Sequence, residues 1–483
     1  MTAKHKKPKN IFFISVECYP IAKVGGLADV VGSLPKYLNQ LDLKVSVVMP
    51  QYDLPWFADK TLNTVYEGHI HFPNWAQPFH IKYYKGDDLG FEVYFVDLPG
   101  LFFRKGVYAD EHGVFFHDET ERYIAFQRAV LQWFAQFANK PDLIHCHDHH
   151  TGLIPFMMKY AYEFAPLKDI PTVFSIHNEN YQGTFSWGKQ YLLPAFDVYK
   201  SGELDWEGRI NPLACAVKCS WKLNTVSPSY MDELKHTSHG LEQLFHHESH
   251  KSQGILNGID TDVWNPSTDP MLDTKYVKSL TYFKSRNKAY LLNTYGLEKG
   301  KTLISFIGRF ALEKGADVLP HAIDHFLAHS HDAVFIILGT GMADTENYFK
   351  HLEHKYPNRI KSLITYDETV SHRIYAGSDF IIMPSRVEPC GLNQMYAMRY
   401  GTIPVVRNTG GLKDSVVSID EKNGTGIKFD HVNSDGINYA LFRAVDLYKD
   451  QKHFTDTRNR CFKQNFSWKK SAQHYKTIYN ELI

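Results

Sequence analysis

Short apolar runs rich in β-branched and aromatic residues recur along the whole chain, separated by longer stretches with helical spacing. Runs that stay apolar at every position are typical of strands buried on both faces of a parallel sheet. Their alternation with helices predicts an α/β protein with doubly wound parallel sheets. The first half of the chain supplies predicted strands at 10–16, 44–50, 91–97, 142–146, 172–176 and 223–227. The second half supplies predicted strands at 303–308, 333–339, 362–366, 379–384, 403–406 and 425–429.

Two domains account for these elements better than one large sheet, because a chain of 483 residues exceeds what one hydrophobic core usually supports. Glycine, asparagine, aspartate and proline concentrate in GILNGIDTDVWNPSTDP at 254–270, which is typical of a domain boundary. We therefore expect two doubly wound domains, at 1–260 and 261–465. Apolar residues at helical spacing in 466–483 predict a terminal helix that packs on one domain or bridges both.

Charge and composition exclude several classes of protein. Lys+Arg and Asp+Glu number 53 each, so the net charge gives no sign of nucleic acid or an anionic membrane as a partner. No apolar run approaches the ~18 residues of a transmembrane helix, and the N-terminal run IFFISV is too short for a secretory signal. The six cysteines include no C-x-x-C pair, which is ordinary for reduced thiols. We expect a cytoplasmic protein that holds any anion by a local cluster of cations.

Polar residues follow the first predicted strand, and ligands of parallel sheets bind beyond the carboxyl ends of the strands. Glu17 and Lys23 precede Gly25 and Gly26, which open a predicted helix. A Gly-Gly turn lets the backbone approach a ligand closely, and the helix N-terminus adds a partial positive charge. The stretch is neither G-x-G-x-x-G nor a Walker loop, so it specifies no dinucleotide or ATP. A glycine-rich turn without a ligand is the alternative.

The second half of the chain carries a stronger anion signal. Arg309 and Lys314 lie in the loop after a predicted strand, and Glu388 lies just before a predicted helix. Two glycine-containing helix starts follow, at 390–392 and 409–411. Two cations and two such helix starts fit a diphosphate better than a single phosphate. A solvated surface loop is the alternative.

Four histidines, a cysteine and an aspartate occupy 145–150, as His-Cys-His-Asp-His-His. A zinc hydrolase would favour a spacing such as His-x-His-x-Asp-His, and here no spacer precedes the aspartate. Because successive residues of a strand point to opposite faces, His145 and His147 share one face and Cys146 takes the other. From the residues alone, a metal site stays open as an alternative.

Seven stretches of the chain resemble, in order, the motifs of glycosyltransferase family 5, the bacterial glycogen synthases and plant starch synthases. They are KVGGLADVVGSLP, HCHDHHTGL, VFSIHNENYQG, VSPSY, GILNGIDTDVWNP, GRFALEKG and PSRVEPCGLNQMYAMRYGTIPVVRNTGGL. The resemblance runs from about residue 10 to the end of the chain. It implies two Rossmann-like domains facing a cleft (the GT-B architecture), with glucan mainly on the first and nucleotide sugar mainly on the second. The helix at 466–483 would then pack back on the N-terminal domain.

Two positions deserve comparison with that family. Val24 stands where the family usually has threonine, which puts one hydroxyl contact in doubt. Broader retaining transferases of this architecture carry a second glutamate eight positions after the first. Tyr396 stands at that distance from Glu388, which resembles family 5 and argues against the broader group.

The resemblance assigns roles to the strand-end residues. Arg309 and Lys314 would neutralise the leaving diphosphate, and Glu388 would hold the donor glucose. His177 would lie beside the anomeric carbon and the sugar 6-hydroxyl, and Asp148 would contact a sugar hydroxyl. These five are the expected catalytic residues. The other histidines of 145–150 become packing and helix-start residues, and no metal is expected.

The remaining expected site residues bind donor or acceptor. For the donor we expect Lys23, Gly25, Gly26, Asn257, Tyr366, Cys390, Gly391, Leu392, Thr409, Gly410 and Gly411. For the acceptor and its sugar hydroxyls we expect Glu17, Asp29 and Asn178. Turn capping is the alternative for Asn257, and a core tyrosine is the alternative for Tyr366, which could stack on the nucleotide base.

The resulting hypothesis is a retaining α-1,4-glucan synthase that transfers glucose from ADP-glucose to the non-reducing end of glycogen or a related glucan. The partners are the nucleotide sugar and the glucan, with no cofactor, no nucleic acid and no membrane. UDP-glucose is the alternative donor, because nothing in the sequence distinguishes adenine from uracil. A metal-dependent hydrolase built on His145–His150 and a catalytically silent glucan-binding protein are the alternatives of a different class.

Overall fold

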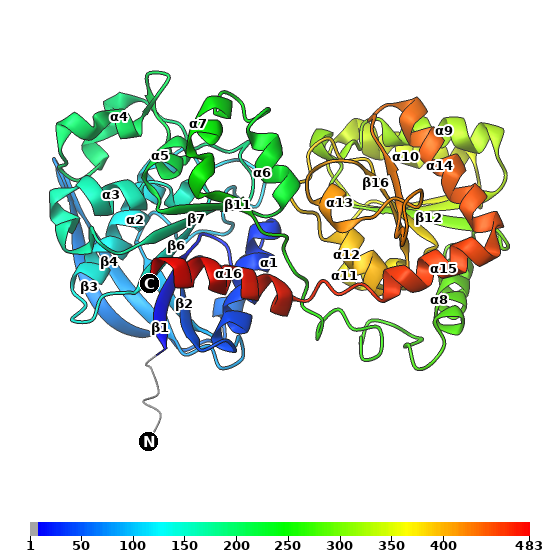
Figure 1. Cartoon of the computed structure of the whole chain (residues 1–483), viewed down its shortest axis with the longest axis horizontal. Coiled ribbons are helices and arrows are strands. Elements are labelled where there is room, and N and C mark those ends of the chain that lie inside the picture. Colours follow the sequence, from blue (N-terminus) through cyan, green and yellow to red (C-terminus); the bar gives the residue numbers. More distant parts are fainter. Residues whose placement is uncertain (1–7) are drawn as a thin grey trace. The chain divides into compact units, whose positions relative to one another are not determined.

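The computed structural model describes residues 8–483, which form two compact α/β units (Figure 1). Unit 1 comprises the described residues up to Val226, together with Met231–Ile255 and Trp468–Ile483. Unit 2 comprises Ser227–Tyr230 and Leu256–Ser467. Each unit contains a sheet with parallel strands, so the predicted fold class is confirmed. No helix of the described chain combines the length and the apolar character that crossing a membrane requires.

Unit 1 is built on a nine-stranded sheet in the order β11-β10-β7-β6-β1-β2-β5-β4-β3. The pairs β3–β4 and β4–β5 are antiparallel, and the other neighbours are parallel. The strands are β1 (Lys9–Ile14), β2 (Leu43–Pro50), β3 (Asn63–Phe72), β4 (Trp75–Tyr84), β5 (Glu92–Asp97), β6 (Leu143–His147), β7 (Thr172–Ile176), β10 (Lys222–Thr225) and β11 (Ser252–Gly254). The chain leaves β1 toward β2 on one side and returns at β6 on the other. This reversal creates a switch point between the carboxyl ends of β1 and β6.

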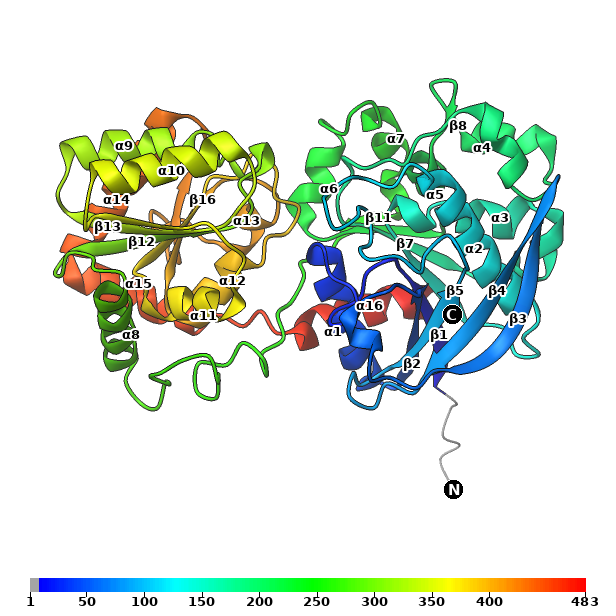
Figure 2. The same ribbon diagram turned by 180° about the vertical axis from the view of Figure 1, so that it is seen from behind.

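Helices cover both faces of this sheet (Figures 1 and 2). They are α1 (Gly26–Asn39), α2 (Glu119–Ala135), α3 (Ile154–Tyr160), α4 (Ser201–Leu204), α5 (Pro212–Cys219), α7 (Glu242–His247) and α16 (Trp468–Leu482). Helix α6 (Pro228–Leu234) contributes residues to both units. The terminal helix α16 packs beside α1, and its Trp468, Tyr475 and Tyr479 are buried. The last helix of the chain is therefore part of the first unit.

Unit 2 is built on a six-stranded parallel sheet in the order β14-β13-β12-β15-β16-β17. Its strands are β12 (Thr302–Ile307), β13 (Ala333–Leu338), β14 (Ile360–Leu363), β15 (Phe380–Met383), β16 (Ile403–Arg407) and β17 (Ile427–Phe429). Its helices are α8 (Leu280–Thr294), α9 (Leu319–His329), α10 (Ala343–Lys355), α11 (Glu368–Gly377), α12 (Asn393–Arg399), α13 (Gly410–Ser415), α14 (Ser434–Lys449) and α15 (Gln451–Phe462).

Both faces of the unit 2 sheet are buried, which explains why its strands are apolar at every position. Leu303 belongs to a hydrophobic cluster with α8, whereas its neighbour Ile304 belongs to a larger cluster with α9 and α14. The order of the strands places a switch point between β12 and β15, because the chain leaves β12 toward β14 and returns on the other side. Loops that follow β12, β15 and β16 therefore meet at one edge of the sheet.

Candidate functional site

Two of the expected catalytic residues of unit 2, Lys314 and Glu388, meet at the switch point between β12 and β15. Lys314 lies after β12, and its Nζ donates to both carboxylate oxygens of Glu388, at 2.8 and 2.7 Å. Ser385, which follows β15, also donates from its hydroxyl to Glu388, at 2.8 Å. Arg309 bonds Glu313 at 2.8 Å, and its side chain is 68% exposed. The structure thus pairs Lys314 with Glu388 and leaves the Arg309 guanidinium at the surface of unit 2.

The two glycine-containing turns pack directly against each other in unit 2. The amide of Gly411 donates to the carbonyl of Glu388 at 3.0 Å, and a Cβ at Gly411 would lie 2.1 Å from the carbonyl oxygen of Cys390. Gly391 has a φ of +70°, a conformation that favours glycine. Because α12 begins only at Asn393, the stretch 390–392 is the turn that leads into it. The starts of α12 and α13 are therefore neighbours beside Glu388.

Asn257 and Tyr366, the other expected donor residues of unit 2, have different surroundings. The Asn257 side chain is buried, and its Oδ1 has no hydrogen-bond partner among residues 8–483. This oxygen does not cap a turn, so that alternative is wrong. Tyr366 follows the edge strand β14 and is 77% exposed, so the core alternative for it is wrong as well. Stacking of Tyr366 on a base stays a prediction.

In unit 1 the glycine loop is held by Glu17. One oxygen of the Glu17 carboxylate accepts from the amides of Val24 and Gly25, at 2.6 and 2.9 Å, and the other accepts from the Tyr108 hydroxyl at 2.6 Å. Burial raises the pKa of Glu17, while these hydrogen bonds lower it. Both carboxylate oxygens already have protein partners, so Glu17 positions the loop whether or not it also meets a sugar.

The space in front of the loop is open. A Cβ added at Gly25 or Gly26 would meet nothing within 4 Å. Lys23, at the start of the loop, bonds Asp29 of α1 at 2.7 Å. The expected donor residue Lys23 and the expected acceptor residue Asp29 therefore form an ion pair in this structure.

Asp148 and His177 follow the adjacent strands β6 and β7, and they are directly linked. One oxygen of Asp148 accepts from the amides of His177 and Asn178, at 2.7 and 3.4 Å. Asp148 has a φ of +56°, which is strained for a residue other than glycine. Burial raises the pKa of Asp148 to about 7 and lowers the pKa of His177 to about 3. At neutral pH this edge of the sheet therefore holds a neutral imidazole beside a carboxyl group that can take either form.

The histidines between 145 and 150 divide into two groups. His145 and His147 stack in the core with ring centroids 4.3 Å apart, on the same face of β6 as predicted. The two ring nitrogens of His145 bond Tyr479 at 2.8 Å and Ser175 at 2.6 Å. His147 bonds the ring of His177 at 3.0 Å. His149 and His150, in contrast, lie in the short 3-10 turn η2 (His149–Thr151) that follows Asp148.

Ser385 and Tyr108 complete these arrangements and were not among the predicted residues. Ser385 lies two residues after the end of β15, so the rule that polar residues at strand ends face a ligand could have found it. Tyr108 lies in the long connection between β5 and α2, far in sequence from Glu17. No local pattern predicts that contact.

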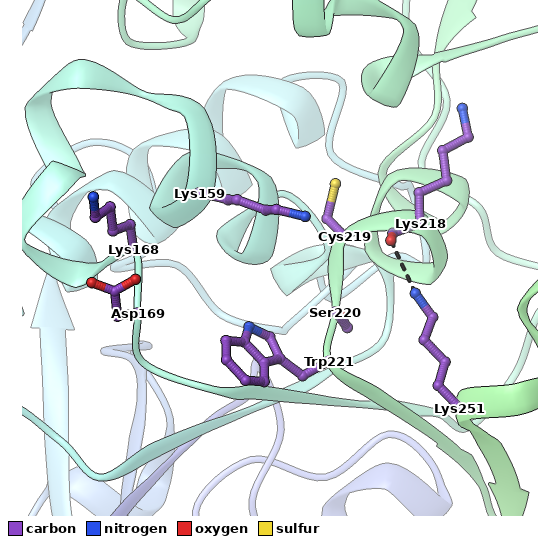
Figure 3. Close-up of a pocket in the computed structure, with 8 residues that line it drawn as sticks. All are labelled: Lys159, Lys168, Asp169, Lys218, Cys219, Ser220, Trp221 and Lys251. Carbon is purple, nitrogen blue, oxygen red and sulfur yellow. Dashed lines mark hydrogen bonds between the residues drawn. The ribbon is translucent and has the colours of Figure 1, made fainter.

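A pocket of about 430 Å³ lies at the opposite edge of the unit 1 sheet (Figure 3). Its lining residues precede β7, β10 and β11 in the chain: Lys159, Lys168, Asp169, Lys218, Cys219, Ser220, Trp221 and Lys251. Lys251 donates to the carbonyl of Lys218 at 2.9 Å, and the Lys218 ammonium donates to two further carbonyls. Two of its lysine ammonium groups therefore bind backbone carbonyls of the protein itself. The pocket contains none of the expected site residues.

Comparison with known proteins identifies the family. Two family models match, a starch synthase catalytic domain over residues 10–247 and glycosyl transferases group 1 over residues 291–460. A glycogen synthase from Flavobacterium johnsoniae is 46% identical over 475 residues, covering 98% of this chain and 99% of that protein. The chain belongs to the glycogen and starch synthase family. The resemblance inferred from the motifs is thereby confirmed.

Other members of this family are similar over the same length. A glycogen synthase from Bacillus anthracis is 36% identical over 488 residues, covering 98% of this chain and 100% of that one. The solved catalytic domain of starch synthase IV from Arabidopsis thaliana, bound to ADP and acarbose, superimposes with a TM-score of 0.86 at 33% identity, covering 98% and 99%. This match confirms the GT-B architecture. A sucrose-phosphate synthase from Thermosynechococcus elongatus, 17% identical with a TM-score of 0.61 and covering 98% and 99%, shares the fold alone.

Proposed function

We propose that the protein transfers glucose from ADP-glucose to the non-reducing end of an α-1,4-glucan, with retention of configuration. The observation that carries this proposal is the Lys314–Glu388 pair at the switch point of unit 2, beside two glycine-containing turns. Membership in a family of glycogen and starch synthases supports the same reaction class. The similar structure of starch synthase IV, which is bound to ADP, favours ADP-glucose over UDP-glucose as the donor.

The chemistry of the donor explains why cations are needed. Breaking the bond between the anomeric carbon and the phosphate oxygen leaves negative charge on the diphosphate, and fixed cations stabilise that charge. The Lys314 ammonium has three N–H groups, two of which reach Glu388, so the third is available to a phosphate oxygen. The guanidinium of Arg309 keeps donors at the surface beyond the one that bonds Glu313. Glu388 would hold Lys314 and a hydroxyl of the donor glucose together.

Unit 1 supplies Asp148 and His177, which we assign to the reacting sugars. Asp148 uses one oxygen for backbone amides, so its other oxygen can accept from a sugar hydroxyl. His177, neutral at pH 7, can face the sugar without repelling the positive charge that develops at the anomeric carbon. Retention without an enzyme nucleophile implies that the acceptor attacks the face from which the diphosphate leaves. The departing phosphate oxygen then takes the acceptor's proton.

The test is incorporation of radiolabelled glucose into glycogen, with ADP-glucose and UDP-glucose compared in parallel. We expect faster incorporation from ADP-glucose and a loss of about 10²–10³-fold in kcat for Lys314→Ala, the usual cost of removing a charge-stabilising donor. Lys350→Ala, on the exposed side of α10, is the matched control and should keep wild-type activity. Equal rates for Lys314→Ala and the wild type would refute the assignment.

The same assay separates the alternatives. A metal-dependent hydrolase would lose activity with a chelator, whereas the proposed transferase would not. Both ring nitrogens of His145 are already bonded in the core, which also speaks against the hydrolase. A silent glucan-binding protein would bind glycogen without incorporating label from either donor.

A further inference from the structure

Two histidines of the 145–150 stretch have no part in the core network. His149 bonds the carboxylate of Glu119, the first residue of α2, at 3.1 Å through Nε2, and its Nδ1 has no partner among the described residues. The Nδ1 atom of His150 has no hydrogen-bond partner within residues 8–483, although His150 is only 6% exposed. A neutral imidazole always carries one N–H donor and one acceptor. Buried polar groups without a partner are rare, so His150 points to a ligand.

The geometry of these residues identifies the ligand class. One ligand atom each from Glu119, His149 and His150 lie within 4.8 Å of one another. Four-coordinate zinc, with bonds of about 2.0–2.2 Å, places its ligand atoms about 3.4 Å apart, so small side-chain rotations would close the set. Glu119 can make such a movement because its side chain is 54% exposed. Two imidazoles and one carboxylate are a donor set that suits Zn²⁺ and Co²⁺.

Packing rather than hydrogen bonding fixes the orientation of the two rings. His150 stacks on Tyr108 with ring centroids 5.1 Å apart, and it meets the edge of Tyr123 at 4.6 Å. His149 lies against Gly183, where an added Cβ would be 2.3 Å from the imidazole Cδ2. The packing therefore holds the two imidazoles in place before a metal arrives, and Glu119 moves to complete the set.

We propose that Glu119, His149 and His150 form a binding site for a tetrahedral transition-metal dication, with Zn²⁺ as the type ion and water as the fourth ligand. His145 and His147 are not ligands. Because η2 directly follows Asp148, the bound ion would sit beside a residue that we assign to the catalytic site. We therefore expect Zn²⁺ to inhibit glucose transfer. This expected inhibition rests on the proposed function, whereas the metal binding does not.

The binding test uses the full chain after metal removal. We expect one equivalent of Co²⁺ to produce the intense visible absorption of four-coordinate cobalt, and Zn²⁺ to abolish it. His150→Ala and Glu119→Gln should each raise the Zn²⁺ dissociation constant at least ~10-fold in equilibrium dialysis. Glu119→Gln keeps the side-chain shape and can still bond His149, so a folding defect does not confuse the result; thermal unfolding of both variants verifies it.

A matched control removes a pair of stacked imidazoles far from this cluster in the sequence, on an exposed part of a helix. His325 and His329 lie one turn apart on α9, with ring centroids at 4.3 Å. His325→Ala/His329→Ala should keep both the cobalt spectrum and the tight Zn²⁺ binding. Loss of the spectrum in this control, with retention in His150→Ala, would overturn the proposal.

The activity test follows glucose incorporation during a Zn²⁺ titration. Wild-type activity should fall at the Zn²⁺ concentration that fills the site, and His150→Ala should need at least ~10-fold more. Metal binding without any transfer activity would refute the proposed function and leave the metal site standing. Binding of maltooligosaccharide that depends on His150, with no four-coordinate cobalt, would assign the two rings to glucan instead and overturn the metal site.

Discussion

At the scale of single residues, Glu388 is the group on which the unit 2 site depends. It accepts from Lys314 and Ser385 through its side chain, and its backbone carbonyl accepts from Gly411. Glu388→Gln would keep the shape but remove the charge that holds the lysine ammonium. We expect kcat to fall about 10²-fold. Ser385→Ala, which leaves the Lys314 pair intact, should cost less than tenfold. Steady-state kinetics would contradict the argument if Ser385→Ala were the more damaging change.

Asp148 predicts a specific dependence of stability on pH. Its pKa is about 7 in the folded protein and about 3.9 in an unfolded chain, so between these values the folded state holds a proton that the unfolded state releases. The contribution of Asp148 to the free energy of unfolding therefore falls as pH rises from about 4 to about 7, by up to about 4 kcal/mol. Asp148→Asn removes that loss.

The measurement is urea unfolding of wild type and Asp148→Asn at pH 5 and pH 7.5. The variant should gain stability relative to the wild type as pH rises, while the other titrating groups affect both proteins alike. A difference that does not change with pH would mean that Asp148 keeps an ordinary pKa in the folded protein.

The sequence predicts site residues that follow strands, but it does not predict residues whose hydrogen-bond partners are distant in the chain. Arg309, Lys314 and Glu388 could be predicted because each follows a strand, and parallel strands bring such residues to one edge. Tyr108, which bonds Glu17, and Glu119, which bonds His149, lie in and after a long connection without periodicity. Only the tertiary fold brings them to their partners, so no local signal exists for them.

At the scale of elements, two glycines test the difference between packing and ligand approach. Gly411 has no room for a side chain, because a Cβ would lie 2.1 Å from the Cys390 carbonyl oxygen. Gly411→Ala should therefore lower the free energy of unfolding by about 1–3 kcal/mol. Gly25 faces open space, so Gly25→Ala should change stability by less than about 0.5 kcal/mol.

Gly25→Ala should affect donor binding even though it leaves the free energy of unfolding nearly unchanged. If a ligand approaches that backbone, Gly25→Ala raises the donor KM although the protein is as stable as the wild type. Calorimetry combined with donor titration separates the two effects. A stable Gly25→Ala variant with wild-type KM would remove Gly25 from the donor site.

The strands show which elements a sequence pattern can reveal. All twelve predicted strands are present, because strands buried on both faces are apolar at every position. The hairpin of β3 and β4 was missed. Many of its residues are exposed, so apolar and polar positions mix and no continuous apolar run forms. Half-buried antiparallel strands at the edge of a sheet need a different pattern from the one that located the parallel core.

At the scale of the whole molecule, α16 links the end of the chain to the first unit. Tyr479 and Tyr475 bond His145 and Asn224 in the core of unit 1. A chain ending at residue 467 would expose that core, so the unfolding transition of unit 1 should drop by at least about 10 °C while that of unit 2 stays. Lys470→Ala, on the exposed side of α16, is the control and should melt like the wild type. Differential scanning calorimetry resolves the two transitions, and an unchanged profile after truncation would refute the role given to α16.

The position of α16 also bears on how the protein is made. A ribosome synthesises unit 2 before it reaches Trp468–Ile483. Unit 1, most of which is translated first, therefore cannot complete its folding until unit 2 has been synthesised. N-terminal domains usually fold while the rest of the chain is still being synthesised. Here the surface of unit 1 that receives Tyr475 and Tyr479 stays uncovered until Trp468–Ile483 has been synthesised, and a product that ends before this helix would expose that surface to chaperones and proteases.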